Sequence, residues 1–510
     1  MSDINHQSVS KRFVISFIGN VGRSCVSFLT GILLARWLGP SEFGRLSFLL
    51  ASFISLRMLV DMSTSNAFFT FISRKQRSLK LITYHWIWLA IQIMIPLLLI
   101  VFILPTNVIE LIWNGSLKGT IVLALIASSM QGVVWTTASQ MSESQRLNSK
   151  VQSIGFAISI VHLAVLIFLY LAGLLAVQFV FVAIAIEWGI AAWLSVRLYF
   201  SRTKKVKYED EPETFKIVLK EYVDYCRPMV FYGALTFLYE FADRWMLQHW
   251  AGPSHQAYFA VAQSFSAIAL LATTSTLSIF WKEISAASHR GDQESVALYY
   301  KKFIRILYFS ATFISCALIP WSKEIVQLLV GSSYSAGSLS FMIMCLYPIH
   351  QTIGQLDGTL LYSTGRTSFK MKTTIWFTIS SLIMTYFTLA PKNAFIPGLG
   401  LLSEGIALKM IIIQVIYVNI INWIISRKFN WKFSYSYQIY NLFIFLVLST
   451  IVHILVNLFL LDLLSASIRM LISTILYFLA SVTILFRFPL IAGISRKELL
   501  SFIDRARNKF

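Results

Sequence analysis

Charged residues are scarce in this chain of 510 residues: Asp, Glu, Lys and Arg make up 13% of it, about half the share found in soluble domains. Hydrophobic residues reach 57% and aromatic residues 15%, and the mean hydropathy is +0.69. Since a water-facing surface could not hide so much apolar side chain, much of the outer surface must face lipid. The composition therefore excludes an ordinary water-soluble enzyme.

Cysteine is also scarce, and the four that occur lie in or beside long apolar stretches (Cys25, Cys226, Cys316 and Cys345). Their spacing matches no metal-binding pattern, so we interpret them as packing residues. The sequence lacks the GxxxxGK[ST] phosphate loop, so the chain does not hydrolyse nucleotide by that route. We expect no cofactor, and an energy source in a gradient, the substrate or a partner.

A cleavable signal peptide is not expected either. The first apolar stretch follows Lys11 and Arg12 directly, is too long for the apolar core of a leader, and ends in Arg36 and Trp37 rather than in small residues. We expect it to remain as the first membrane helix.

Long apolar stretches follow one another along the whole chain. A bilayer core about 30 Å thick requires roughly 20 apolar residues of helix, and continuous runs of that length indicate helices rather than the alternating strands of a barrel. The sequence predicts an all-α polytopic membrane protein with about fourteen transmembrane helices. Their predicted spans are 12–37, 46–72, 82–104, 117–141, 151–171, 174–198, 226–250, 256–281, 303–321, 336–362, 372–391, 397–425, 437–460 and 468–489.

Lys and Arg are concentrated in the connections on one side of the predicted membrane. Positive charge near a helix end resists translocation, so the basic connections are predicted to be cytoplasmic and, with an even number of helices, both termini as well. The basic set comprises residues 11–12, 74–80, 202–220, 282–302, 366–372, 427–428 and 496–509. The formal charge of +20 is thereby explained by topology, and no nucleic acid is expected as a partner.

Two blocks of six helices are separated by a charged stretch. Residues 39–41 and 252–254 both read Gly-Pro-Ser, and each triplet follows the first helix of its block. We therefore predict parallel pseudo-repeats that rock around a central site, followed by two additional helices. The predicted parts are an N-terminal lobe (1–200), a charged cytoplasmic linker (201–223), a C-terminal lobe (224–430), and two further helices with a basic cytoplasmic tail (431–510).

Ionisable residues within the predicted helices are the candidate site. Each costs about 2.5 to 3.5 kcal/mol at a helix centre unless it is paired or faces water inside the bundle. The basic residues are candidates for binding an anionic substrate: Arg23, Lys409, Arg57 and Arg244. The acidic residues are candidates for ion coupling or gating: Asp61, Glu187, Glu240, Asp243, Asp357 and Glu404.

Structural roles remain open for several of these residues. Arg57 with Asp61, and Glu240 with Arg244, are four residues apart and can form ion pairs along one helix face. Arg23 and Lys409 have no nearby acid in sequence, which makes them the better anion candidates. Asp357, Glu404 and Glu187 lack a local cation, as a proton carrier would. The histidines within apolar stretches are expected to be satisfied interior residues (His162, His350 and His453).

Two segments resemble a known family. Residues 32–44 read ILLARWLGPSEFG, which is similar to the opening of polysaccharide flippases, and Asp243-Arg244 followed by Gly252-Pro253 and residues 258–262 resembles their second half. These proteins, which include the Wzx-type O-antigen flippases, belong to the multidrug/oligosaccharidyl-lipid/polysaccharide (MOP) exporter superfamily, with the MATE transporters. The sequence departs from the family pattern after Asp61, where Met62-Ser63 replaces an expected glycine.

The resemblance implies a function. A flippase of this family moves an oligosaccharide on undecaprenyl diphosphate from the cytoplasmic to the periplasmic leaflet of the bacterial inner membrane by alternating access. It implies coupling to a proton or sodium gradient, action as a monomer, and other polysaccharide assembly proteins as further partners. Arg23 and Lys409 would bind the diphosphate, and the last two helices would guide the lipid tail.

Two alternatives remain open from the sequence. A multidrug or metabolite cation antiporter of the same superfamily would share the bundle, and the buried acids slightly favour it. A membrane polymerase or ligase acting on lipid-linked glycans would require a sizeable outward loop, whereas the longest predicted here runs only from 320 to 338. We therefore expect a transporter and not an enzyme.

Overall fold

The computed structural model describes residues 9–74, 77–203, 214–429, 431, 435–461, 463–494 and 496–498. These residues contain helices and no strands, which confirms the all-α class. Nine helical segments of the described residues are long and apolar enough to cross a membrane on their own. The contacts divide the chain into two compact units, with the boundary between Ala257 and Tyr258.

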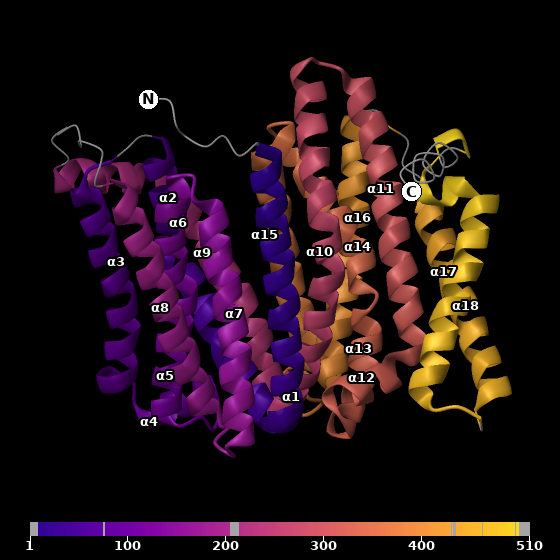
Figure 1. Ribbon diagram of the computed structural model, residues 1–510, viewed down its shortest axis with the longest axis horizontal. Coiled ribbons are helices and arrows are strands. Elements are labelled where there is room, and N and C mark those ends of the chain that lie inside the picture. Colours follow the sequence, from indigo (N-terminus) through magenta and orange to yellow (C-terminus); the bar gives the residue numbers. More distant parts are fainter. Residues whose placement is uncertain are drawn as a thin grey trace. The chain divides into compact units, whose positions relative to one another are not determined.

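Unit 1 is a bundle of helices that run side by side (Figure 1). It contains α1 (Val9–Asp61), α2 (Thr64–Arg74), α3 (Leu79–Leu98), α4 (Thr106–Trp113), α5 (Lys118–Ser129), α6 (Trp135–Ser144), α7 (Asn148–Leu171), α8 (Val177–Thr203) and α9 (Phe215–Ala251). Two π-helical turns extend α3 and α5: η1 (Leu99–Ile103) and η2 (Met130–Val134).

Unit 2 is a second helical bundle, and α10 leads into it. The first turn of α10 (Pro253–His289) belongs to unit 1 and the rest of this helix to unit 2. Unit 2 also contains α11 (Gln293–Leu318), α12 (Ser322–Val330), α13 (Ser338–Met344), α14 (Tyr347–Ser363), α15 (Thr367–Leu389), α16 (Leu402–Lys428), α17 (Tyr435–Leu460) and α18 (Ala466–Arg487). Short 3-10 turns occur at η3 (Ile319–Trp321), η4 (Ser332–Gly337) and η5 (Pro489–Ala492). Asp292 caps α11 by accepting from the Ser295 amide at 3.0 Å, and hydrogen bonds from Ser295 lower the pKa of this carboxyl.

α1 contains the first predicted crossing and most of the second. Its 53 residues would extend about 80 Å if straight, more than twice the bilayer core. The backbone instead turns at Gly39, whose φ is 74° and ψ 171°, and Pro40 restarts the helix. α2 consequently lies at the end of the unit at which α1 began (Figure 1). Gly252, before Pro253, has nearly the same φ and ψ (84° and 174°), so the two Gly-Pro-Ser triplets form equivalent turns.

The observed boundaries of two other helices differ from the predicted ones where proline or glycine constrains the backbone. The predicted helix 336–362 is divided into α13 and α14, because Pro348 has no amide hydrogen to continue a helix and is placed in the first turn of α14. The predicted helix 397–425 begins only at Leu402, after Pro397 and two glycines.

The predicted charged linker, 201–223, is partly helical. Ser201–Thr203 end α8, and α9 already begins at Phe215; residues 204–213 lie outside the described residues. Val218 of α9 is buried in a cluster with residues of α2, α3, α6 and α8, and this burial explains the extension of the helix. The division into lobes at this linker stays a prediction, and the boundary found from contacts lies after α9.

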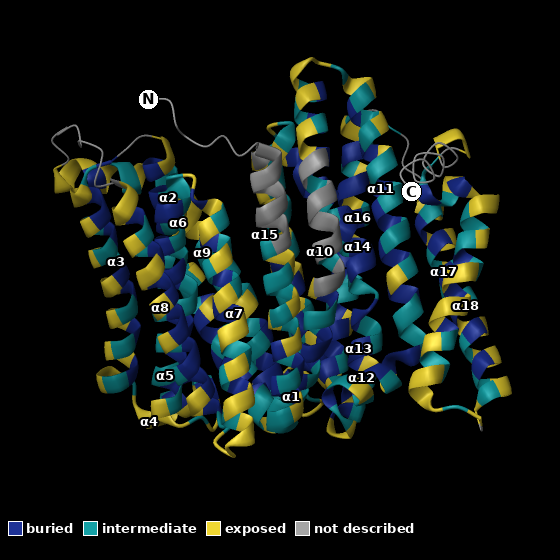
Figure 2. Cartoon of the chain, viewed as in Figure 1, coloured by how far each residue is buried: buried dark blue, intermediate teal, exposed yellow. Residues whose placement is uncertain are grey.

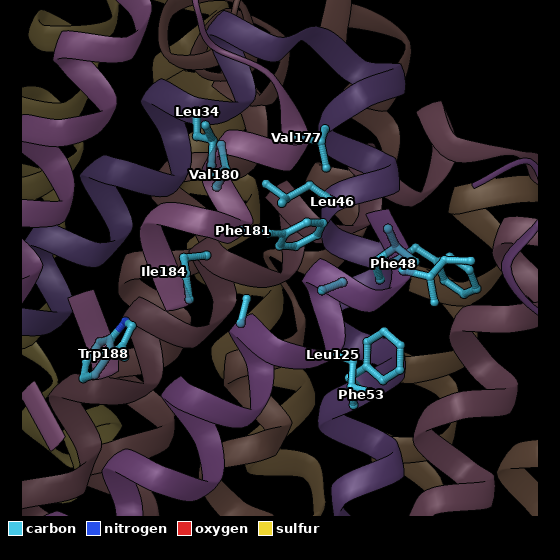
Figure 3. Close-up of a cluster of buried hydrophobic side chains, with 14 of the residues drawn as sticks. Leu34, Leu46, Phe48, Phe53, Leu125, Val177, Val180, Phe181, Ile184 and Trp188 are labelled. Atoms are coloured by element: carbon cyan, nitrogen blue, oxygen red, sulfur yellow. The ribbon is translucent and has the colours of Figure 1, made fainter. Parts of the chain in front are cut away.

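The main core of unit 1 joins segments that are far apart in sequence. Leu34, Phe48 and Phe53 of α1 pack against Leu125 of α5 and a row of α8 that includes Phe181 (Figure 3). By contrast, α3, α7 and α18 carry long exposed faces, and these faces are largely aliphatic and aromatic (Figure 2). Such faces suit contact with lipid rather than water.

Gly44 allows a close helix contact within unit 1. A Cβ atom on Gly44 would lie 1.8 Å from the carbonyl oxygen of Pro253, a distance that no neighbouring atoms could tolerate. The first Gly-Pro-Ser segment therefore packs through its following glycine against the second one. This contact gives a physical reason for the glycine at the end of the ILLARWLGPSEFG stretch.

We expect Gly44→Ala to destabilise the protein strongly, by about 3 kcal/mol or more, because the methyl group must push two backbones apart. The melting temperature of the purified full chain in detergent measures the effect. Gly31→Ala is the matched control, because a Cβ at Gly31 of the same helix meets nothing within 4 Å. Equal stability of Gly44→Ala and the wild type would contradict the contact.

Met62 and Ser63, which stand where the resemblance predicts a glycine, have left-handed backbones with φ of 47° and 66°. We expect Ser63→Gly to stabilise the protein by about 0.5 to 1 kcal/mol, since glycine adopts positive φ without strain. Ser149→Gly, in the ordinary helical backbone of α7, should change stability by a similar amount in the opposite direction. Thermal unfolding of both variants tests the difference in sign, and a lower melting temperature for Ser63→Gly would argue against it.

Candidate functional site

Two of the predicted anion-binding residues border the same turn of helix in unit 1. Arg57 donates from Nη1 to the carbonyl oxygen of Gly132, within the π-helical turn η2. Arg23 lies over Gly155 of α7, where a Cβ would be 3.5 Å from its Nη1 and 3.6 Å from the ring of Trp135. Gly132 and Trp135 are three residues apart, so both guanidinium groups approach the junction of η2 and α6.

The positions of these arginines along α1 explain why they meet. Arg23 is 16 residues before Gly39 and Arg57 is 18 residues after it. At a rise of 1.5 Å per residue, they lie about 24 and 27 Å from the turn, at nearly the same depth. Gly132 is close to the middle of the apolar segment Lys118–Ser144. The two positive charges are therefore held within the membrane-spanning part of the bundle.

A π-helical turn at this point exposes a backbone acceptor. The carbonyl oxygen of Gly132 accepts from Arg57 and also from Thr136 Oγ1 at 2.6 Å. Such turns often occur at functional sites, because they interrupt the regular ladder of helical hydrogen bonds. Here the carbonyl orients Arg57 without neutralising its charge, which leaves its other guanidinium nitrogens able to donate to an anion.

Arg23 has an acidic neighbour that sequence reasoning missed. Its charge is attracted by Glu143, which lies on α6 and is 120 residues away in the chain. Arg23 is half-buried rather than completely enclosed. Its positive charge is thus offset within the bundle, which reduces the cost of keeping a guanidinium at this depth.

The predicted pair of Arg57 and Asp61 does not form. While Arg57 binds Gly132, Asp61 accepts from Thr64 Oγ1 (3.0 Å), the Ser65 amide (3.1 Å) and Ser65 Oγ (2.6 Å). Asp61 thereby caps the start of α2 after the break at Met62 and Ser63. The i, i+4 spacing predicts a pair only if the helix continues unbroken and no better acceptor lies near Arg57.

Three charged residues in the second half of α9 interact with one another. Glu240 and Asp243 both attract Arg244 from the same helix, and Asp243 is buried whereas Glu240 is exposed. The predicted interaction of Glu240 with Arg244 is therefore present. Arg244 is compensated by two acids, which makes it a weaker candidate for an anionic substrate than Arg57.

Glu187 has a partner on the neighbouring helix. His162 of α7 contacts it through Nδ1 at 2.6 Å from Oε2, and the side chains are 17% and 7% exposed, respectively. His350 and His453 are also in contact with neighbours: the first packs its ring edge-on against Tyr308, and the second contacts Asn457 and Trp321. Among the cysteines, Cys25 is exposed, contrary to the expectation of packing, and the other three are buried.

Unit 2 contains three of the predicted site residues in different settings. Asp357 of α14 is completely buried with Tyr300 of α11 and Asn422 of α16. Lys409 is also completely buried, two turns into α16. Glu404 lies in the first turn of α16 because that helix begins later than predicted, and a carboxylate there is stabilised by the helix dipole.

An apolar cavity of about 650 Å³ lies among α2, α3 and α9 of unit 1. Its lining begins at Met62, five residues after Arg57, and includes the aromatic residues Tyr84, Trp88, Phe215 and Tyr222. At Gly233, α9 comes so close to α1 that a Cβ would be 2.7 Å from the carbonyl oxygen of Met58. The cavity is therefore adjacent, along the chain, to the turn that carries Arg57.

A smaller cavity with charged residues in its lining lies beside α2 and α9. It is lined by Arg74 and Arg77 together with Glu221 and Asp224, and Arg77 forms an ion pair of 2.6 Å with Glu221. Across the part of the chain that the structure describes, no three His, Cys, Asp or Glu residues are grouped as metal ligands.

Comparison with known proteins gives the family and the fold. A family model described as polysaccharide biosynthesis protein matches residues 9–280, more than half of the chain. No curated protein matches the sequence. Among solved structures, the chain is similar to a lipid II flippase, MurJ, in an inward closed conformation, with 15% identity and a TM-score of 0.67 over 94% of this chain and 100% of that one.

Two other solved structures share the fold at lower similarity. A multidrug resistance MATE family transporter of the MOP superfamily, in an outward-facing conformation, is 13% identical with a TM-score of 0.55 over 82% of this chain and 94% of that one. A MOP superfamily transporter from Pyrococcus furiosus is 14% identical with a TM-score of 0.51 over 81% and 94%. The chain thus belongs to the polysaccharide biosynthesis protein family and has the fold of the MOP superfamily transporters.

Proposed function

We propose that the chain is a flippase that moves an oligosaccharide linked to undecaprenyl diphosphate, such as an O-antigen repeat unit, across the bacterial inner membrane. The observation that carries this proposal is the pair of arginines at one turn of η2 and α6, within a chain of the polysaccharide biosynthesis protein family. A diphosphate is an anion that guanidinium groups bind with paired hydrogen bonds. The solved proteins with the same fold are described as a flippase and as transporters.

The physical task matches the distribution of charge in unit 1. A glycan and a diphosphate cannot cross hydrocarbon unaided, whereas a polyprenyl tail never needs to leave it. In our proposal Arg23 and Arg57 bind the diphosphate, and the adjacent apolar cavity near Met62 accommodates part of the tail. Lys409 and Arg244 remain further candidates for the substrate, and both termini are cytoplasmic. The protein acts as a monomer, with other polysaccharide assembly proteins as partners.

A cation antiporter is the second candidate function. The buried acids favour it, since Asp357 is completely enclosed and Glu187 nearly so. The residues at η2 favour the flippase, because two cationic side chains would repel a cationic drug or metabolite. The two functions differ in what the host loses when the gene is removed.

Deleting the gene and measuring surface glycan separates the candidates. A flippase mutant should lose surface polysaccharide and retain lipid-linked repeat units that face the cytoplasm. Normal surface glycan together with new drug sensitivity would instead support the antiporter. Either result decides which substrate class the membrane bundle carries.

Arg23→Ala and Arg57→Ala should each reduce surface glycan about tenfold or more in the deletion strain, since a hydrogen bond to a charged group contributes about 1.5 to 3 kcal/mol. Arg23→Lys should restore only part of the activity, because an ammonium lacks the paired donors. Arg45→Ala is the control: the side chain of this arginine of α1 is exposed and pairs with the exposed side chain of Glu42. Full complementation by Arg23→Ala at equal protein level would remove Arg23 from the site.

The pair of His162 and Glu187 tests whether this acid has a structural role. Glu187→Leu alone should destabilise the protein by about 1 to 3 kcal/mol because it leaves half-buried His162 without its partner. His162→Leu combined with Glu187→Leu should restore most of the lost stability, as measured by thermal unfolding. A stable double variant that retains surface glycan would establish a structural role. A stable double variant without surface glycan would identify Glu187 as a coupling residue.

A further inference from the structure

Asp357 is enclosed with two polar partners from neighbouring helices of unit 2. Its exposed fraction is 0%, and those of Tyr300 and Asn422 are 1% each. Tyr300 Oη contacts both Asp357 Oδ1 and Asn422 Oδ1. Asn422 Nδ2 donates to the carbonyl oxygen of Val418 at 2.9 Å and to Asp357 Oδ2 at 3.4 Å. These contacts connect α11, α14 and α16 into one polar cluster.

The number of hydrogens in this cluster determines the state of Asp357. A tyrosine hydroxyl has a single hydrogen, but Tyr300 Oη faces two oxygen atoms, one on Asp357 and one on Asn422. If Asp357 were ionised, one of these two contacts would bring lone pairs together in a completely buried site. If Asp357 is protonated, it donates to Tyr300 Oη, and Tyr300 donates to Asn422 Oδ1. Every contact then has its hydrogen.

Rotating the amide of Asn422 does not remove the need for this proton. In the rotated form Nδ2 would donate to Tyr300, which could then donate to Asp357. However, Asn422 Oδ1 would face the Val418 carbonyl oxygen and Asp357 Oδ2, which are both acceptors when Asp357 is ionised. The rotated form therefore has more unfavourable contacts, and the orientation with a protonated acid is the consistent one.

The surrounding groups do not compensate a negative charge on Asp357 directly. The nearest cation is Lys370 of α15, which interacts with Asp357 electrostatically but donates its hydrogen bond to Tyr417 Oη of α16. Tyr435 of α17 is the other titratable group near Tyr300. The residues one turn before and after Tyr300 on its face of α11 are apolar and buried, and α13 carries no titratable residue.

We propose that Asp357, Tyr300 and Asn422 form a proton-binding site, with the proton carried by Asp357 in this conformation. The oxygen atoms of the cluster are in direct hydrogen-bond contact, which leaves no space between them for a sodium ion. The use of this site for coupling rests on the transport function proposed above, whereas the protonation of Asp357 does not depend on it.

Lys370 gives the site a second state. A Cβ on Gly358, the residue after Asp357, would be 3.9 Å from Lys370 Nζ, so a small shift of α15 along α14 would bring the ammonium to the carboxyl. The carboxylic acid would then lose its proton to water, and the resulting carboxylate would pair with the ammonium. Each cycle of the site thus takes up one proton and releases one. Between these two steps, the hydrogen bond with Tyr300 stabilises protonated Asp357.

Infrared spectroscopy of the purified full chain tests protonation directly. We expect a carbonyl band of a protonated carboxylic acid at neutral pH, its loss in Asp357→Asn, and a shift of its frequency in Tyr300→Phe. Glu110→Gln is the control, because Glu110 is exposed on α4, far in sequence from this cluster. The absence at neutral pH of a band that depends on Asp357 would overturn the proposal, whatever the transport result.

Transport measurements then test coupling separately. In the deletion strain, Asp357→Asn at normal protein level should lower surface glycan about tenfold, and a protonophore should lower wild-type glycan while removal of sodium should not. Dependence on sodium alone would overturn the proton as coupling ion. If the infrared band of Asp357 is present but the deletion strain has normal surface glycan, the proton-binding site is supported and the flippase function is rejected.

Discussion

Hydrocarbon offers no hydrogen bonds, and each polar group inside the bilayer must therefore find a partner within the protein. This constraint accounts for the placement of nearly every charge discussed above. Arg57 binds a carbonyl freed by a π-helical turn, Asp61 caps a broken helix, and Glu187 binds His162 on the next helix. Asp357 satisfies the same requirement as a neutral acid with Tyr300. Charges that remain capable of binding substrate are those whose partners leave some donors unused.

The same constraint governs the backbone. Helices end where a cap, a glycine or a proline supplies what lipid cannot: the turn at Gly39 is followed by Pro40, and the break after Asp61 is closed by its carboxylate. The close approach of Gly44 to Pro253 then connects the first turn to its equivalent in the second half of the family pattern. The glycines and prolines of the family motif are thus required for packing and for turns, and they have little chemical role.

Function in this chain depends on which helices meet. Arg23 and Arg57 are 34 residues apart, yet the hairpin formed by α1 places them at similar depth beside η2. The polar cluster of unit 2 likewise draws on three helices, with Tyr300 and Asn422 separated by 122 residues. Neither arrangement has a spacing rule along the chain, which is why a search for local ion pairs found Asp61 as the partner of Arg57 and overlooked Glu143 as the neighbour of Arg23.

The sequence by itself determined the all-α membrane class, the paired Gly-Pro-Ser turns and the list of charged residues within the helices, because apolar length, glycine conformation and the cost of burying charge act locally. The fold decided which polar groups meet: the pairing of His162 with Glu187 and the contact of Asp357 with Tyr300 are both made between helices. It also decided that α16 begins at Leu402, so that Glu404 lies in the first turn of the helix rather than further along it. Such contacts depend on side-chain packing between distant segments, which periodicity and hydropathy do not encode.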